Sequence, residues 1–85
     1  MNEDLVMIPT EDGKILRFYK KHTVSYVGND GKVRLLHNCS VIGDRLHGLT
    51  PWKVVNGRQQ YRSVIIELYD NTVEEIAELV SIANA

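Results

Sequence analysis

The chain has a single cysteine, Cys39, which excludes an intrachain disulfide. No apolar run approaches the ~20 residues that a membrane-spanning helix needs. The first four residues, Met-Asn-Glu-Asp, include two acidic and no basic residues, whereas a secretory signal begins with basic residues. These absences predict a soluble, cytoplasmic protein in which Cys39 is a small, reduced core residue.

No catalytic or metal-binding motif is present either. The nearest candidate is a group of side chains that can ligate metals or form nucleophile–base pairs: His37, Asn38, Cys39, Asp44 and His47. Their spacing matches no paired C-x-x-C pattern, so structural roles explain them better. The carboxylates near the C-terminus are better explained as helix-capping and solvated groups than as acid–base pairs. We therefore expect a protein without cofactor, metal or enzymatic activity.

The composition is that of a small folded domain. The chain has 85 residues, of which 44% are hydrophobic and 25% charged, which are ordinary values for a globular protein. We expect residues 1–85 to form one domain.

The charges, in contrast, are sorted along the chain. All 10 Lys and Arg residues lie between Lys14 and Arg62, where only Asp30 and Asp44 oppose them, so this stretch carries +8. The acidic residues before and after it contribute −4 and −5, which leaves a net charge of −1. Such asymmetry is informative about partners rather than about the fold.

Most of the chain has the two-residue period of β-strands. Leu16 and Phe18 share one face, as do Val24 and Tyr26. The run of residues 32–35 alternates as well, and we expect Val33 and Leu35 to face the core with Lys32 and Arg34 in solvent. The Asp-Gly and Asn-Gly pairs at 30–31 and 56–57 predict hairpin turns. The expected strands cover residues 5–8, 15–19, 23–27, 32–35, 52–55 and 58–69.

Two segments break this period. Residues 40–47 predict a short helix with Ile42 and Leu46 on one side, ended by Gly48. The C-terminal segment predicts a longer amphipathic helix that begins with a Thr72–Glu75 capping box. Its apolar stripe consists of Val73, Ile76, Ala77, Val80 and Ala83, and its solvated face of Glu74, Glu78 and Ser81.

The expected fold is therefore α+β, with a mostly antiparallel sheet of about six strands, a short middle helix and a C-terminal helix. The sheet is either open or curled into a small barrel. Residues 14–46 loosely resemble the LytTR type of DNA-binding domain, through Tyr26-Val27, Asp30-Gly31-Lys32 and a short helix ending at Leu46. The closing strand and helix resemble those of bacterial pleckstrin-homology-like domains instead. Neither resemblance assigns residues to the site, and the sequence is assigned to no family.

Two positions in the last hairpin remain open. Arg62 has the same parity as Val64 and Ile66, so either a bulge changes the register near Arg62 or the basic end of the strand extends past the core. For Trp52, a core position against the last helix is the preferred interpretation, and an exposed contact residue is the alternative.

The leading functional hypothesis is a non-catalytic regulatory module whose basic sheet and turns bind nucleic acid or an acidic protein surface. The residues expected to contact the anionic partner are Lys20, Lys21, Lys32, Arg34, Arg58 and Arg62. One alternative is a protein–protein inhibitor or adaptor, of the kind that phages and mobile elements encode, which edge strands could pair into a homodimer. A weaker alternative is a pleckstrin-homology-like binder of membranes or phosphoinositides. The hypothesis of an anionic partner requires the separated cations to lie together on one face.

Overall fold

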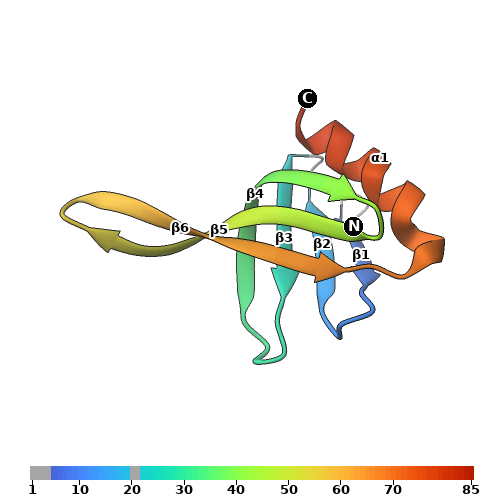
Figure 1. Cartoon of the computed structure of the whole chain (residues 1–85), viewed down its shortest axis with the longest axis horizontal. Helices are drawn as coiled ribbons and strands as arrows, with labels where there is room; N and C mark the ends of the chain where they lie inside the picture. Colours follow the sequence, from blue (N-terminus) through green and yellow to red (C-terminus); the bar gives the residue numbers. More distant parts are fainter. Residues whose placement is uncertain (1–4, 20–21) are drawn as a thin grey trace.

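The computed structural model describes residues 5–19 and 22–85. Six strands form an antiparallel sheet in the order β1-β2-β3-β4-β5-β6, so each strand pairs with its neighbour in sequence (Figure 1). The expected antiparallel sheet of about six strands with a C-terminal helix is confirmed, and the sheet is open. The elements are β1 (Leu5–Pro9), β2 (Ile15–Tyr19), β3 (Thr23–Val27), β4 (Val33–Ile42), β5 (Arg45–Val55), β6 (Arg58–Glu67), the 3₁₀ turn Asp70–Thr72 and α1 (Val73–Ala83).

The hairpin turns follow the predicted chemistry. Asn56 and Gly57 have φ values of 52° and 78°, the positive pair that a type I′ turn requires. Gly31, with φ of 78°, closes the turn between β3 and β4, where its N–H donates to the Gly28 carbonyl at 3.0 Å. Both predicted hairpins are therefore present.

The predicted middle helix is wrong, because residues 40–47 form the end of β4, a tight turn and the start of β5. Gly43 has φ of 62°, which a two-residue hairpin turn uses and a right-handed helix does not. Across this hairpin Val41 pairs with Leu46, and both side chains turn inward, whereas Ile42 is exposed. The short helix ending at Leu46 was part of the resemblance to LytTR domains, and it is absent here.

The expected orientation of β4 is also wrong. Val33 and Leu35 are exposed, whereas Leu36 is buried and Arg34 is partly buried. The turn before β4 sets this register, since Leu36 lies opposite Val24 and Arg34 opposite the buried Tyr26. The alternation was predicted correctly, but the face was not, because only the pairing with β3 determines it.

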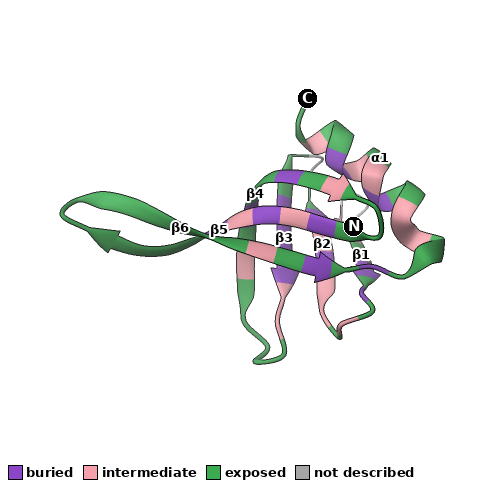
Figure 2. Ribbon diagram, viewed as in Figure 1, coloured by how far each residue is buried: buried purple, intermediate pink, exposed green. Residues whose placement is uncertain are grey.

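A bulge in β4 bends the sheet. The register between β4 and β5 shifts between His37 and Ser40, and Asn38 has a φ of 54°. The second half of β4, with β5 and β6, consequently crosses over β1–β3 (Figure 1), and buried residues of both parts belong to one core cluster (Figure 2). The sheet does not close, so the small-barrel alternative is not supported. The core contains Ile8, Leu16, Phe18, Val24, Tyr26, Leu36, Cys39, Leu46, Ile66, Leu68, Ile76 and Val80.

Helix α1 packs against β3 and β4 with the expected stripe, of which Ile76 and Val80 are buried. Its expected capping box is wrong: Thr72 has helical backbone angles, and its hydroxyl donates to the Tyr69 carbonyl at 2.8 Å. The 3₁₀ turn before the helix places Thr72 inside a turn, so its side chain bonds backwards. Among the described residues, no helix has the length and apolarity to cross a membrane.

Candidate functional site

A two-stranded ribbon projects from the folded sheet. Residues 51–63 are all exposed and include the outer half of β5 and the first half of β6 (Figure 2). The basic start of β6 therefore extends past the core, one of the two arrangements left open for Arg62. We call residues 51–63 the ribbon.

A bulge at the base of the ribbon positions Trp52. Pro51 pairs with Tyr61 and Lys53 with Gln60, so Trp52 is an extra residue without a partner in β6. Trp52 is 54% exposed, and the expected core position is wrong because the strand leaves the core before reaching it. The Arg62 guanidinium lies over the indole ring, 4.1 Å from its centroid, in a cation–π contact.

The pairing places the ribbon cations on one face. Side chains directly opposite each other in an antiparallel ladder lie on the same side of the sheet, and along each strand every second side chain lies on that side. Arg58 and Arg62 share the parity of the buried Ile66, and Lys53 pairs with Gln60, which has this parity as well. The core-facing side of the sheet thus continues into the basic side of the ribbon. Because a two-stranded ribbon is twisted, the direction in which this basic side faces changes along the ribbon from its base to its tip.

Beneath the base of the ribbon lies a cavity of about 330 Å³. Its charged lining comes from segments far apart in the sequence: the turn before β2, the start of β4 and the ribbon. The residues that line it are Lys14, Tyr26, Arg34, Thr50, Pro51, Trp52, Arg62, Ser63, Val64 and Ile65. We call this the ribbon cavity.

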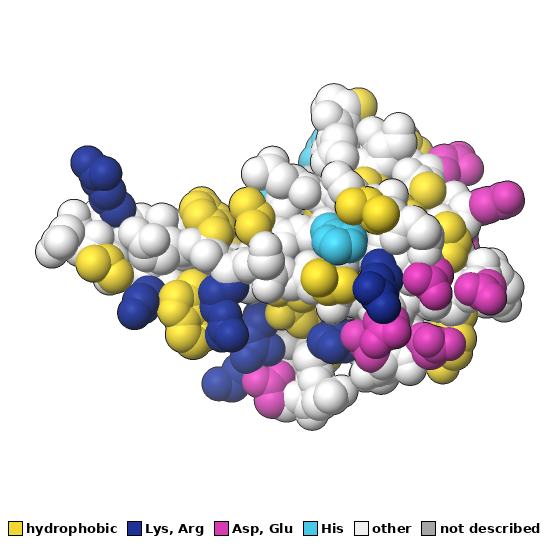
Figure 3. All heavy atoms as spheres, in the orientation of Figure 1, with side chains coloured by type: hydrophobic (Ala, Val, Ile, Leu, Met, Phe, Trp, Pro, Cys, Tyr) yellow, Lys and Arg dark blue, Asp and Glu magenta, His cyan; other side chains and the backbone are white. Residues whose placement is uncertain are grey.

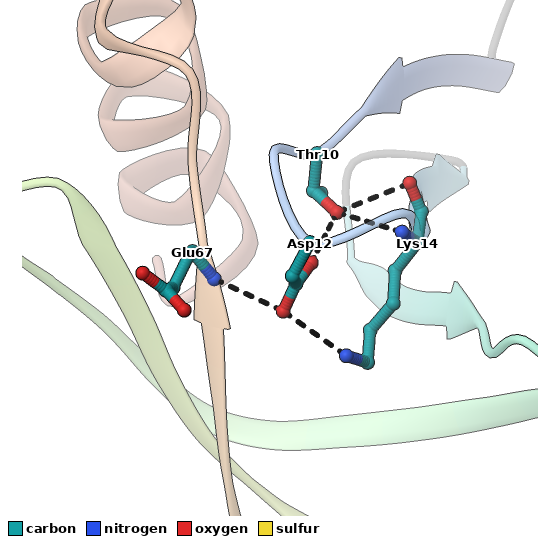
Figure 4. Close-up of polar contacts among 4 residues, drawn as sticks. All are labelled: Thr10, Asp12, Lys14 and Glu67. Carbon is teal, nitrogen blue, oxygen red and sulfur yellow. Dashed lines mark hydrogen bonds and ion pairs between the residues drawn. The ribbon is translucent and has the colours of Figure 1, made fainter.

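Lys14 is held in place by a network of hydrogen bonds (Figure 4). Its Nζ donates to the Asp12 carboxylate at 3.0 Å, which also accepts from the Thr10 hydroxyl at 2.6 Å and from the Glu67 N–H at 3.3 Å. Partial burial opposes ionisation of Asp12, but these hydrogen bonds outweigh it and lower its pKa. The network joins the β1–β2 turn to the end of β6 and so fixes one wall of the ribbon cavity.

Arg34 forms a two-pronged pair with Asp30 in the preceding turn. Its Nη1 and Nη2 donate to the two carboxylate oxygens at 3.1 and 2.8 Å. Hydrogen bonds from the Arg34 guanidinium hold the pKa of Asp30 well below its usual range. This pair is exposed, and exposed ion pairs contribute little to stability. A guanidinium binds phosphate with the same fork geometry.

Arg62 differs from the other two cations. Within residues 5–19 and 22–85 the ion pairs are Lys14–Asp12 and Arg34–Asp30, and Arg62 belongs to neither and lies over the Trp52 ring. The ribbon cavity therefore combines an arginine without an acidic partner, two neutralised cations and two aromatic rings.

The space-filling view shows how the charges separate over the surface (Figure 3). Basic side chains gather beneath the ribbon and at its junction with the sheet, and another lies at the ribbon tip. Most of the acidic side chains gather at the opposite end, over α1 and the end of β6.

Comparison with protein-family models, curated proteins and solved structures found no match to this chain.

The residues expected to bind an anion fall into four groups. Arg34 and Arg62 line the ribbon cavity, and Arg58 lies beside the turn at the ribbon tip. Lys32 is exposed in the β3–β4 turn, outside the cavity lining. Lys20 and Lys21 lie outside the described residues.

Sequence reasoning did not assign Lys14, Tyr26 or Trp52 to the site. Lys14 was counted among the cations, but nothing local connects it to Arg62. Tyr26 alternates with Val24 and is buried as expected, yet it also contributes to the cavity lining. For Trp52, the available signal was Pro51, which has no N–H for a ladder and is found in sheets at edges and bulges.

The His/Cys group does not form a site. In the described part of the chain, no three His, Cys, Asp or Glu side chains are arranged to hold a metal. Cys39 is buried, and burial raises the pKa of its thiol to about 11, which disfavours the nucleophilic thiolate. Its carbonyl accepts a hydrogen bond from the Asn84 side chain at 3.0 Å, a link between β4 and the end of α1.

Proposed function

We propose that this protein is a non-catalytic nucleic-acid-binding module that holds a phosphate backbone along the basic surface under its ribbon. One observation carries the proposal: Lys14, Arg34 and Arg62, from three separate segments, line the same cavity as Trp52 and Tyr26. Cations that neutralise phosphates, next to aromatic rings that stack on bases, are the common chemistry of nucleic-acid surfaces.

The charge distribution supports the same proposal. Lys53 and Arg58 extend the basic surface along the ribbon, whereas Glu74, Glu75 and Glu78 lie at the other end of the molecule on α1. A polyanion approaching the protein is attracted to the ribbon and repelled from the helix, which orients the encounter.

The test is a fluorescence-anisotropy titration with labelled mixed-sequence DNA and RNA at several salt concentrations. We expect the logarithm of the binding constant to fall linearly with the logarithm of salt concentration, because bound phosphates release counterions. Arg62→Ala is expected to weaken binding to all sequences alike and to reduce the salt slope by about 1. No binding, or binding independent of salt, would contradict the proposal.

Arg45→Ala is the matched control. Arg45 is also an exposed arginine of the sheet, but it pairs across the ladder with Glu67, away from the ribbon. We expect this variant to bind as the unchanged protein does. Equal losses in the two variants would mean that general positive charge, and not the ribbon surface, attracts the nucleic acid.

A second candidate function is a protein–protein adaptor or inhibitor that acts as a homodimer. It is supported by large apolar side chains exposed on the sheet and ribbon: Val33, Leu35, Val54, Tyr61 and Ile65. Exposed apolar patches are typical of contact surfaces. Light scattering that gives a dimer mass, together with a stoichiometric protein partner that survives nuclease treatment, would favour this candidate over nucleic acid.

A further inference from the structure

We propose that the ribbon cavity receives an unpaired nucleotide, with its base against Trp52 and its phosphate on the surrounding cations, so that the target is single-stranded nucleic acid. This inference rests on the proposed function and names its substrate class. It is carried by the size of the cavity, the exposure of the indole ring and the placement of the cations.

The size of the cavity suits one small group. Its volume of about 330 Å³ is at the lower end of the range of about 300–1,000 Å³ found for small-ligand sites. A duplex presents only the edges of its bases in its grooves, because the faces are stacked on neighbouring pairs. An unpaired strand has free base faces that can enter such a cavity.

Trp52 offers an aromatic surface at the edge of this cavity. The bulge turns it out of the ladder, and 54% of the residue stays exposed although Arg62 lies 4.1 Å from the ring centroid. Aromatic side chains that stack with bases are tolerant of sequence, since every base has a π-face, and arginine beside the ring strengthens the platform. The contact with Arg62 also orders the indole before a ligand arrives.

The cations of the cavity lining come from separate segments of the chain. Lys14 and Arg34 line the cavity from the β2 and β4 side, and Arg62 lines it from the ribbon. Thr50 and Ser63 contribute polar lining between them. A strand with its base at Trp52 would therefore meet Arg62 from the ribbon, and Lys14 and Arg34, each paired with an aspartate, from the other segments.

The experiment uses the intrinsic fluorescence of Trp52, which is the only tryptophan of the chain. The full-length protein is titrated with single-stranded DNA, with single-stranded RNA of the same sequence and with the DNA duplex. We expect both single strands to quench the emission and to bind more tightly than the duplex. The comparison of the DNA and RNA arms identifies which single strand is preferred.

Trp52→Ala tests the stacking role directly. We expect it to reduce the affinity for the single strand by roughly 5- to 150-fold, with the salt slope unchanged, because stacking releases no counterions. Trp52→Phe is expected to restore part of the affinity. Tyr61→Ala is the matched control, since Tyr61 is 50% exposed on the opposite face of the same ribbon, where it pairs with Pro51. Circular dichroism confirms that each variant is folded.

The outcomes separate the two proposals. One outcome would overturn this inference and leave the proposed function standing. In that outcome binding depends on salt, but the duplex and the single strand bind with equal affinity, the tryptophan emission is unchanged and Trp52→Ala has no effect on affinity. An equal loss in Trp52→Ala and Tyr61→Ala would overturn it as well. Absence of binding to all three nucleic acids would overturn both.

Discussion

Neighbouring residues in one strand of this protein meet opposite environments. Ile66 is fully buried at 0% exposure, whereas Ile65 is 51% exposed on the other face of β6. Their side chains are identical, so any difference between variants at the two positions reports on burial alone. The strand period predicts that adjacent residues differ, but the packing of β6 onto the core determines which of them is inside.

We expect Ile66→Ala to lower the free energy of unfolding by about 2–5 kcal/mol, through lost burial and the cavity left behind. Ile65→Ala is expected to change it by about 0.5 kcal/mol or less. Urea denaturation followed by circular dichroism measures both. If Ile66→Ala does not fold, Ile66→Val should still cost about 0.5–1.5 kcal/mol. Equal effects at the two positions would contradict the described packing of β6.

Cys39 gives a prediction about pH. The residue is 4% exposed, and burial raises the pKa of its thiol from 9.0 to about 11. Between these values the unfolded chain has lost the thiol proton and the folded chain has kept it. The contribution of Cys39 to stability is therefore complete below pH 9.0 and is lost as the pH rises to about 11.

The ultraviolet absorbance of the thiolate measures this shift. In a titration of the folded protein we expect the Cys39 midpoint near pH 11, and in urea near 9.0. Subtracting the same titration of Cys39→Ala removes the absorbance of the tyrosines. A midpoint near 9.0 in the folded protein would mean that the thiol is open to solvent.

At the scale of elements, the ribbon is the part of the sheet with the least support. Its strands pair only with each other, and residues 51–63 are all exposed. An isolated two-stranded hairpin is marginally stable in water. The type I′ turn at Asn56-Gly57, the contact between Trp52 and Arg62 and the hydrogen bond from the Gln59 side chain to the Lys53 carbonyl at 3.1 Å are thus among the local interactions that keep it ordered.

We expect the backbone amides of residues 53–60 to exchange with solvent faster than those of β5 and β6 over the core, because the ribbon opens without unfolding the sheet. Gly57→Ala should accelerate this exchange further, since φ of 78° strains an L side chain. The free energy of global unfolding should change little. Hydrogen exchange followed by NMR measures both, and uniform protection along β5 and β6 would contradict the prediction.

The elements also differ in how far local sequence determines them. The Asn-Gly turn and the apolar stripe of α1 were predicted correctly, because each depends on residues close together in the chain. Residues 40–47 were predicted incorrectly as a helix, since Ile42 and Leu46 have helical spacing and the competing hairpin depends on pairing with β3 and β6. The capping box at Thr72 was also predicted incorrectly, because Thr72 lies in the 3₁₀ turn and its hydroxyl donates to the Tyr69 carbonyl instead.

At the scale of the whole molecule, the fold preserves the order of charges along the chain and turns it into a separation in space. The acidic C-terminal segment becomes α1, and the basic middle supplies the ribbon and the turns near it. Only some of the Lys and Arg side chains come together at the ribbon. Arg17 pairs with Met7 and Ser25 on the outer face of the sheet, and Arg45 lies opposite Glu67, so neither contributes to the ribbon cavity.

Composition and short-range pattern were enough to predict the strand-rich fold, the two hairpins, the final helix and the sorted charges, because propensity, turn geometry and charge are properties of nearby residues. The inward face of β4, the bend at Asn38 and the exposure of Trp52 depend on register between strands. The meeting of Lys14, Arg34 and Arg62 depends on it most, since these residues are brought together only when the sheet folds over its own core.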